Sequence, residues 1–213
     1  MKCMNNILRD QYQQAADYLS AHDARLAPVI AREGLCTIVP HTNYYQDLVE
    51  SIISQQLSVK AAASISARFK ALFDGNIPKP ETILATDVDT MRSVGLSNQK
   101  ANYIRDLASH VASGKVSFTH LPELSNQEII TELTDVKGIG EWTVHMFLMF
   151  CMGRLDVLAH GDLGIRNGIR ALYNLDHVPT PKEIIAIAEV NKWHPYESIA
   201  CWYIWRSLDN KNS

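Results

Sequence analysis

Apolar side chains recur at helical spacing along nearly the whole chain. One helix face is marked by intervals of three and four between Leu48, Ile52, Ile53 and Leu57. A second helix, which Asp74-Gly75-Asn76 then ends, carries Ala61, Ile65, Phe69 and Phe73. Few stretches alternate apolar and polar residues as a half-buried strand would. The pattern therefore predicts an all-α fold.

Capping residues mark where several of these helices begin. Ser97 is a candidate N-cap, and Ser125 with Glu128 forms an S-x-x-E capping box before another apolar stripe. Further along the chain we expect helices over residues 141–152, 162–174, 180–191 and 196–208. No linker rich in glycine, serine or proline divides the chain.

Composition and charge exclude some classes of protein but do not indicate a function. The 213 residues are 46% hydrophobic, which is ordinary for a chain that builds a core. A net charge of −3 argues against a protein that coats nucleic acid, although a local basic patch can still bind phosphate. No apolar run approaches about 18 residues, so we expect no membrane span. The N-terminus lacks the apolar core of a signal peptide, so we expect a cytoplasmic protein, nucleoid-associated when on DNA, or a nuclear one in a eukaryote.

The cysteines and histidines lack the local spacing of metal sites. Cys3, Cys36, Cys151 and Cys201 are far apart, with no C-x-x-C pair. No H-x-x-x-H spacing occurs either, so we expect no catalytic zinc. The cysteines are predicted to be reduced and mostly buried thiols.

The sharpest local signal covers residues 133–143. An amphipathic helix ends near Asp135, and Gly138 and Gly140 then flank a single apolar residue, Ile139. Ile139 can pin such a turn to the core, while the glycines allow another molecule to approach the backbone closely. The next helix starts at once, and its unpaired N–H groups suit a phosphate oxygen.

Lys137, inside this turn, adds a cation that favours phosphate contact. An ordinary αα-hairpin with a glycine-rich turn is the alternative, and it needs no ligand. The residues alone leave both interpretations open.

Asp162 stands at the start of the helix expected over residues 162–174. A carboxylate there is a good N-cap, which is the plainer interpretation, and it is also a candidate catalytic group. The helix that follows the hairpin would be about 18 Å long. Residues 153–161 can then extend about 30 Å, so the chain has room to return beside the hairpin.

The hairpin, followed at this distance by Asp162, resembles the helix-hairpin-helix DNA glycosylase superfamily. Within it, the chain resembles the DNA-3-methyladenine glycosylase II branch over about residues 43–207, including Ser54-Gln55-Gln56-Leu57-Ser58. The resemblance implies two helical lobes with a cleft between them. We expect one lobe from residues 1–42 plus about 176–213, and a central lobe, residues 43–175, that carries the hairpin at about 133–143.

The resemblance also implies an activity. It is the monofunctional hydrolysis of the N-glycosidic bond of alkylated purines, of the 3-methyladenine or 7-methylguanine type, in base excision repair. The damaged base would be flipped out of double-stranded DNA, with Asp162 as the catalytic carboxylate, and the enzyme is expected to be a monomer. Relatives that cut the strand use a lysine where Trp142 stands, so no lyase activity is expected. Only Cys201 lies where some relatives hold an iron–sulfur cluster, so we expect no cluster and no required cofactor.

Site residues follow from the same resemblance. The base pocket would be formed by Trp142, Met146, Leu163 and Trp205. DNA would be contacted by Lys137, Gly138, Ile139, Gly140 and Thr143. The side chains inserted from the minor groove would be Gln56 and Leu57. A structural Na+ or K+ would bind the backbone carbonyls of Thr134, Val136 and Gly138. Core packing is the alternative for any tryptophan, and we expect it for Trp193 and Trp202.

Three other functions stay open at this point. The first is a glycosylase for another damaged or mismatched base, whose pocket would need hydrogen-bonding side chains. The second is a non-catalytic helix-hairpin-helix DNA-binding protein. The third, a helical bundle that binds no DNA, leaves the glycines and Lys137 of the hairpin unexplained.

Overall fold

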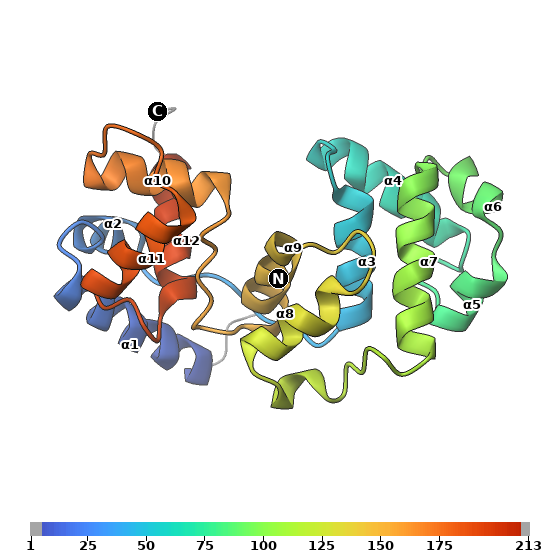
Figure 1. The fold of residues 1–213 in the computed structure, drawn as a ribbon, viewed down its shortest axis with the longest axis horizontal. Helices are drawn as coiled ribbons and strands as arrows, with labels where there is room; N and C mark the ends of the chain where they lie inside the picture. The colour runs from blue at the N-terminus through green and yellow to red at the C-terminus, as the bar shows by residue number, and fades with distance from the viewer. Residues whose placement is uncertain (1–5, 210–213) are drawn as a thin grey trace. The chain divides into compact units, whose positions relative to one another are not determined.

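The computed structural model describes residues 6–209, and within that range it contains helices and loops but no strand (Figure 1). The predicted all-α fold is confirmed. The helices form two compact units. Unit 1 combines the described residues up to His41 with those from Leu148 onward, and unit 2 is Thr42–Phe147.

Unit 1 is built around its last helix. Its helices are α1 (Asn6–His22), α2 (Ala27–Glu33), α10 (Leu163–Tyr173), α11 (Pro181–Val190) and α12 (Glu197–Asp209). α12 packs against α1, α2 and α10 (Figure 1). Residues 198–204 of α12 are all buried, so this helix is apolar around most of its circumference at that level.

A buried carboxylate ties the segments of unit 1 together. Asp23 is fully buried and accepts a hydrogen bond of 2.7 Å from the Trp193 indole nitrogen. It also accepts hydrogen bonds from the Tyr173 hydroxyl and from the backbone N–H groups of Arg25 and Leu26. A buried charge needs such a set of donors. Because Tyr173 ends α10, this network fixes one end of that helix.

Unit 2 is arranged around α7 (Asn98–Ala112). Its other elements are α3 (Tyr44–Ser54), α4 (Val59–Ala71), α5 (Pro80–Ala85), α6 (Val88–Ser93), the short 3-10 helix η1 (Leu121–Glu123), α8 (Asn126–Thr134) and α9 (Glu141–Met146). Figure 1 shows α7 with α3 on one side and α5 and α6 on the other, and α7 packs against all three. The buried side of α7 consists of Ala101, Ile104, Leu107 and Ala108.

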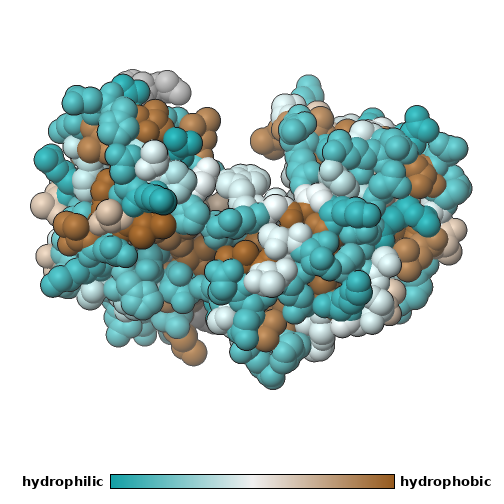
Figure 2. Space-filling view, in the orientation of Figure 1, coloured by the Kyte–Doolittle hydropathy of each residue, from teal (hydrophilic) through white to brown (hydrophobic). Residues whose placement is uncertain are grey.

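The predicted capping residues are confirmed. The Ser97 side chain accepts a hydrogen bond from the Lys100 N–H at the start of α7. Ser125 and Glu128 form a reciprocal capping box at the start of α8. Thr180 and Glu183 form a second capping box at the start of α11, and this box was not predicted from the sequence. Hydrophilic side chains cover most of the visible face of each unit, with smaller hydrophobic areas between them (Figure 2).

Three boundaries differ from the expectation. α3 ends at Ser54, so Leu57 lies in the following turn and not on the buried helix face. The helix expected over residues 141–152 is α-helical only to Met146 and continues as a π-helical segment, η2 (Phe147–Met152). The central lobe was expected to reach residue 175, but unit 2 ends at Phe147. Residues 148–175 belong to unit 1, because α10 packs on α12.

Within the described residues, no helix is both long and apolar enough to span a bilayer. The predicted core tryptophans Trp193 and Trp202 are buried, with 0% and 8% of their surface exposed. Cys36, Cys151 and Cys201 are buried thiols, as predicted, and Cys3 lies outside the described residues.

Candidate functional site

In unit 2, the helices α8 and α9 are joined by a short turn, which forms the predicted hairpin. α8 ends with Asp135 as its C-cap, and α9 begins at Glu141 with Gly140 as its N-cap. Ile139 is 3% exposed, so it pins the turn to the core. Since Gly140 has no side chain, it cannot cap the first turn of α9 as serine or aspartate would. At Gly140 the start of α9 therefore has no side-chain cap over its backbone.

Gly138 owes its identity to a close contact with α7. Its φ is +87°, a conformation that favours glycine. A Cβ built on it would lie 2.1 Å from a ring carbon of Tyr103. Asp106, one turn further along α7, accepts a hydrogen bond of 2.8 Å from the Lys137 N–H. Tyr103 and Asp106 of α7 therefore support the turn through contacts with Gly138 and Lys137. Neither residue was assigned a role from the sequence.

The side chains of the predicted DNA contacts differ in exposure. Lys137 is 79% exposed at its side chain, and its ammonium nitrogen lies 4.0 Å from an Asp106 carboxylate oxygen. Thr143 is 7% exposed and Ile139 is buried. These two residues therefore offer little side-chain surface to a partner.

Two of the three carbonyls predicted to hold a cation already accept hydrogen bonds. The Val136 carbonyl accepts from the Ile139 N–H at 3.1 Å, and the Gly138 carbonyl accepts from the Gln55 amide nitrogen at 2.8 Å. Each carbonyl oxygen has a second lone pair. The Val136 and Gly138 carbonyls can therefore each still accept a cation, and the site at Thr134, Val136 and Gly138 stays a prediction.

The turn between α3 and α4, residues 55–58, carries Gln56 and Leu57, the side chains predicted to insert from the minor groove, and is called the wedge turn below. Gln56 is exposed and has a φ of +56°, which is uncommon for a residue other than glycine. Leu57 is 38% exposed. Ser58 caps α4 by accepting a hydrogen bond from the Ala61 N–H. The turn thus displays one polar and one apolar side chain on a well-defined backbone.

Asp162 in unit 1 is the N-cap of α10, as its plainer interpretation predicted. One oxygen, Oδ1, accepts two hydrogen bonds of 2.8 Å, from the Ile165 N–H and from the Trp205 indole N–H. The carboxylate is half-buried at the positive end of an 11-residue helix. Donors from two different helices, α10 and α12, thus hold Asp162 Oδ1 in place.

Gly164 leaves room for this pair. A Cβ on Gly164 would lie 2.9 Å from Asp162 Oδ1 and 3.0 Å from two atoms of the Trp205 indole ring. Phe150, on η2, packs against Trp205 with ring centroids 5.6 Å apart and is 40% exposed. Neither Gly164 nor Phe150 was assigned a role from the sequence. Leu163, next to Asp162, is 63% exposed.

The remaining pocket candidates lie in unit 2, on α9. Trp142 is 51% exposed, and Met146 follows one turn later and is half-buried. A half-exposed tryptophan offers a broad apolar and electron-rich surface to a ligand. The structure therefore brings Asp162, Leu163 and Trp205 together within unit 1, and it places Trp142 and Met146 on one helix of unit 2.

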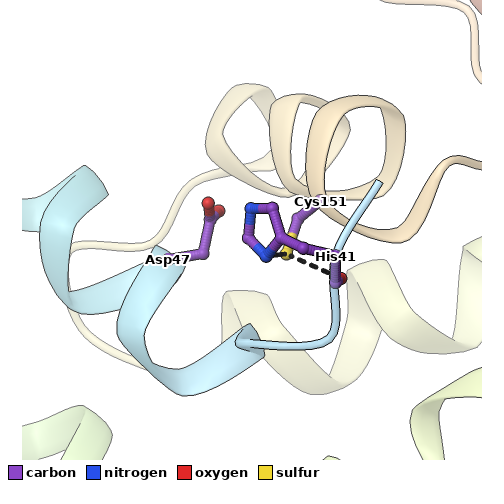
Figure 3. A group of neighbouring side chains, drawn as sticks. All are labelled: His41, Asp47 and Cys151. Carbon is purple, nitrogen blue, oxygen red and sulfur yellow. Dashed lines mark hydrogen bonds between the residues drawn. The ribbon is translucent and has the colours of Figure 1, made fainter. Parts of the chain in front are cut away.

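His41 and Cys151 of unit 1 lie side by side, as Figure 3 shows. The Cys151 sulfur is 3.5 Å from His41 Nδ1, and the His41 N–H donates to the Cys151 carbonyl at 2.9 Å. Asp47, also drawn in Figure 3, belongs to unit 2. Two side chains are fewer than the three or four that a protein zinc site uses, so we propose no metal at this pair.

Known proteins are similar to this chain in both sequence and fold. DNA-3-methyladenine glycosylase 1 of Schizosaccharomyces pombe is 39% identical over 76% of this chain and 72% of its own length. The crystal structure of a DNA-3-methyladenine glycosidase from Bacillus halodurans superposes with a TM-score of 0.84, at 38% identity, covering 93% of this chain and 90% of that one. An S. pombe 3-methyladenine DNA glycosylase in complex with abasic DNA superposes with a TM-score of 0.82, at 34% identity, over 94% of this chain and 98% of that one.

A family model also matches residues 49–193, a segment that contains the hairpin, the wedge turn and Asp162. The chain therefore belongs to the HhH-GPD superfamily of base excision DNA repair proteins.

Proposed function

We propose that this chain is a monofunctional DNA glycosylase that hydrolyses the N-glycosidic bond of alkylated purines, of the 3-methyladenine or 7-methylguanine type. Family membership supports base excision repair, and the names of the relatives support alkylated bases. The observation that carries the proposal is the Asp162 carboxylate, which the Trp205 indole and the start of α10 hold in place.

Asp162 would act on the sugar rather than on the base. An alkylated purine such as 3-methyladenine carries positive charge, so it leaves readily without a strong general acid. Positive charge then develops on the sugar, and a fixed carboxylate stabilises it and can orient or deprotonate the attacking water. Because two N–H groups fix Oδ1, the carboxylate needs little rearrangement during the reaction.

Aromatic side chains would receive the flipped base. Trp205 and Leu163 lie beside Asp162 in unit 1, and Trp142 and Met146 are the candidates in unit 2. A cationic base is attracted to an indole face by about 1–2 kcal/mol once water is excluded. Phe150, which packs on Trp205, extends this aromatic surface within unit 1.

DNA would be held by the hairpin and opened by the turn between α3 and α4. Lys137 and the backbone of Gly138 and Gly140 would contact phosphate, and Gln56 with Leu57 would fill the space that the flipped nucleotide leaves. A cation at the hairpin carbonyls would be structural. We further propose that the protein acts as a monomer on double-stranded DNA containing damaged bases, in the cytoplasm or nucleus.

No strand cleavage is part of the proposal. Trp142 stands where the lyase relatives carry their lysine, and an indole cannot form a Schiff base with the sugar. The expected products are the released base and an intact strand with an abasic site.

Incubation of the protein with methylated duplex DNA tests the activity directly. Free methylpurine should appear in the supernatant, and the strand should break only after alkali treatment. DNA binding without base release would support the non-catalytic alternative. Release of oxidised or mismatched bases but not methylpurines would support the other glycosylase alternative, and strand scission without alkali would overturn the monofunctional assignment.

A further inference from the structure

The hairpin and the wedge turn of unit 2 are joined by one side chain. Gln55, the residue between α3 and the exposed Gln56, donates from its amide nitrogen to the Gly138 carbonyl at 2.8 Å. These residues are 83 positions apart in the chain. A side-chain amide on a backbone carbonyl of a tight turn restricts both partners, because Gly138 is already pressed against Tyr103.

Lys100 of α7 fixes the same turn from its other side. Its ammonium nitrogen donates to the Ile53 carbonyl at 2.8 Å and to the Gln55 carbonyl at 2.7 Å. These carbonyls lie at the C-terminal end of α3, where a cation is favoured by the helix dipole. The residue is partly buried, and burial lowers the pKa of Lys100. A lysine held in this way serves the backbone of the turn.

The turn needs such support because Gln56 adopts the left-handed conformation, with a φ of +56°. A residue other than glycine persists there only when its surroundings hold it. The Leu57 N–H donates to the Ser54 carbonyl at 3.1 Å, which closes the turn locally. Figure 2 shows a hydrophobic area at the connection between α3 and α4, where Leu57 and Val59 are exposed. The backbone is therefore fixed while its side chains project into solvent.

We propose that Gln55 is a positioning residue that couples the hairpin to the wedge turn, with Lys100 holding the turn in place. The inference rests on the proposed function, because it assumes that the hairpin binds duplex DNA and that Gln56 and Leu57 enter it. Through Gln55, the hairpin bound to phosphate sets where the wedge meets the base pairs. Gln55 itself touches neither the sugar nor the base that reacts.

A purely structural role for Gln55 would give different results. It would lower stability and DNA affinity together, and it would act independently of the wedge. A coupling role predicts that Gln55 matters only while the wedge side chain is present. A double-mutant cycle separates the two, because residues that work through one another are non-additive.

Gln55→Met removes the amide donor and keeps the length of the side chain. Gln46→Met is the matched control, because the Gln46 amide donates to Glu50 one turn along the same helix, at 3.2 Å, and not to the hairpin. Both variants are combined with Gln56→Ala. Two quantities are measured for each protein: the single-turnover release of methylpurine, and the fluorescence of a 2-aminopurine placed next to the lesion, which rises when the base unstacks. Thermal unfolding and the affinity for undamaged duplex are measured in parallel.

Gln55→Met should slow base release about tenfold in the wild-type background and less than about twofold in the Gln56→Ala background. The 2-aminopurine signal should fall in the same order, while the affinity for undamaged duplex changes by less than about threefold. Gln46→Met should match the wild type in all measurements. Lys100→Met is a second variant of the same pathway and should show the same dependence on Gln56.

Multiplicative effects of Gln55→Met and Gln56→Ala would overturn the inference, as would wild-type behaviour of either single variant. A wild-type protein that releases no methylpurine refutes the proposed function instead. In that case the 2-aminopurine signal alone decides the coupling, because it requires duplex distortion and no chemistry.

Discussion

At the scale of single residues, Asp162 combines a structural and a chemical role. Its Oδ1 caps α10 through the Ile165 N–H and accepts the Trp205 indole N–H, and these two hydrogen bonds help to fix the position of the carboxylate. The cap and the catalytic group are therefore the same side chain. A substitution can separate the two roles only if it keeps the hydrogen bonds and removes the charge.

Gly164→Ala tests whether the Asp162–Trp205 pair must keep its geometry. The added methyl group would lie 2.9 Å from Asp162 Oδ1 and 3.0 Å from the indole, so one of the two has to move. Alanine also gains up to about 1 kcal/mol of helix propensity over glycine. We therefore expect base release to slow at least about tenfold, while the unfolding free energy changes by less than about 1 kcal/mol. Single-turnover assays and urea denaturation measure the two effects.

Gly161→Ala is the control for this variant. Gly161 precedes Asp162 directly, yet a Cβ there meets nothing within 4 Å. It should leave base release near the wild-type rate. Equal losses in both variants would mean that any change beside Asp162 is harmful, and full activity of Gly164→Ala would refute the required geometry.

Residue identities were predictable where a local pattern or the family resemblance marked them. Asp162 follows from its place at a helix start, and the buried Trp193 and Trp202 were expected in the core. Gln55 and Gly164 were not assigned roles, because their importance comes from contacts with residues distant in sequence. Gln55 reaches Gly138 and Gly164 faces Trp205, and no local pattern records either contact.

At the scale of elements, helix starts were predicted better than helix ends. Ser97, Ser125 and Asp162 each accept a backbone N–H within three residues, which is a local signal. The end of α3 at Ser54 depends on the Lys100 ammonium and the left-handed Gln56, which are tertiary and backbone effects. Helical periodicity continued past that end and so included Leu57 wrongly.

The exposed lysine of the hairpin should contribute to the salt dependence of DNA affinity. Lys137 is exposed on the turn, so Lys137→Ala should remove about one phosphate contact and reduce the slope of log affinity against log salt concentration by about 1. Affinity should weaken to a similar extent on damaged and undamaged duplexes, because phosphate contacts carry no base information. Fluorescence anisotropy at several salt concentrations measures this.

Lys115→Ala provides the comparison, since Lys115 is an exposed lysine of the same unit outside the hairpin. Its salt slope should equal that of the wild type. An unchanged slope for Lys137→Ala would show that the Lys137 side chain makes no phosphate contact.

At the scale of the whole molecule, the division into two units could not be derived from local sequence. No change of composition marks the boundary at Phe147, which falls where α9 gives way to the π-helical segment. Residues 148–175 are connected to the rest of unit 1 through the packing of α10 on α12 and through the buried Asp23 network. Those contacts are long-range, so the expected boundary at residue 175 was wrong.

Buried cysteine thiols and tyrosine hydroxyls make the stability of the fold sensitive to alkali. Burial raises the pKa of the Cys36 and Cys201 thiols to about 12, and it also raises the pKa of Tyr12, Tyr45, Tyr173 and Tyr203. Groups whose pKa is higher in the folded state stabilise the fold fully below their unfolded pKa, about 8.5 for cysteine. This contribution is lost as the pH rises through the folded pKa. The unfolding free energy should therefore be flat up to about pH 8 and should fall from about pH 9 toward pH 12.

Urea denaturation at about pH 7.5, 9 and 10.5 measures this trend, because these values bracket the unfolded pKa values of cysteine and tyrosine. Cys201→Ala should show a shallower loss between the last two points, because one of the buried thiols is removed. A free energy of unfolding that stays constant to the highest pH would contradict the effect of burial on these groups.

The central claim, that Asp162 is the catalytic carboxylate of an alkylpurine glycosylase, is tested most directly by single-turnover release of methylpurine by Asp162→Asn. Asparagine caps helices as well as aspartate does and can still accept from Ile165 and Trp205, so the variant removes the charge and keeps the structure. Asp176→Asn, at an exposed aspartate of the same unit, is the control. We predict that Asp162→Asn slows release at least about 100-fold with unchanged folding, while Asp176→Asn matches the wild type. Release by Asp162→Asn at the wild-type rate would contradict the claim.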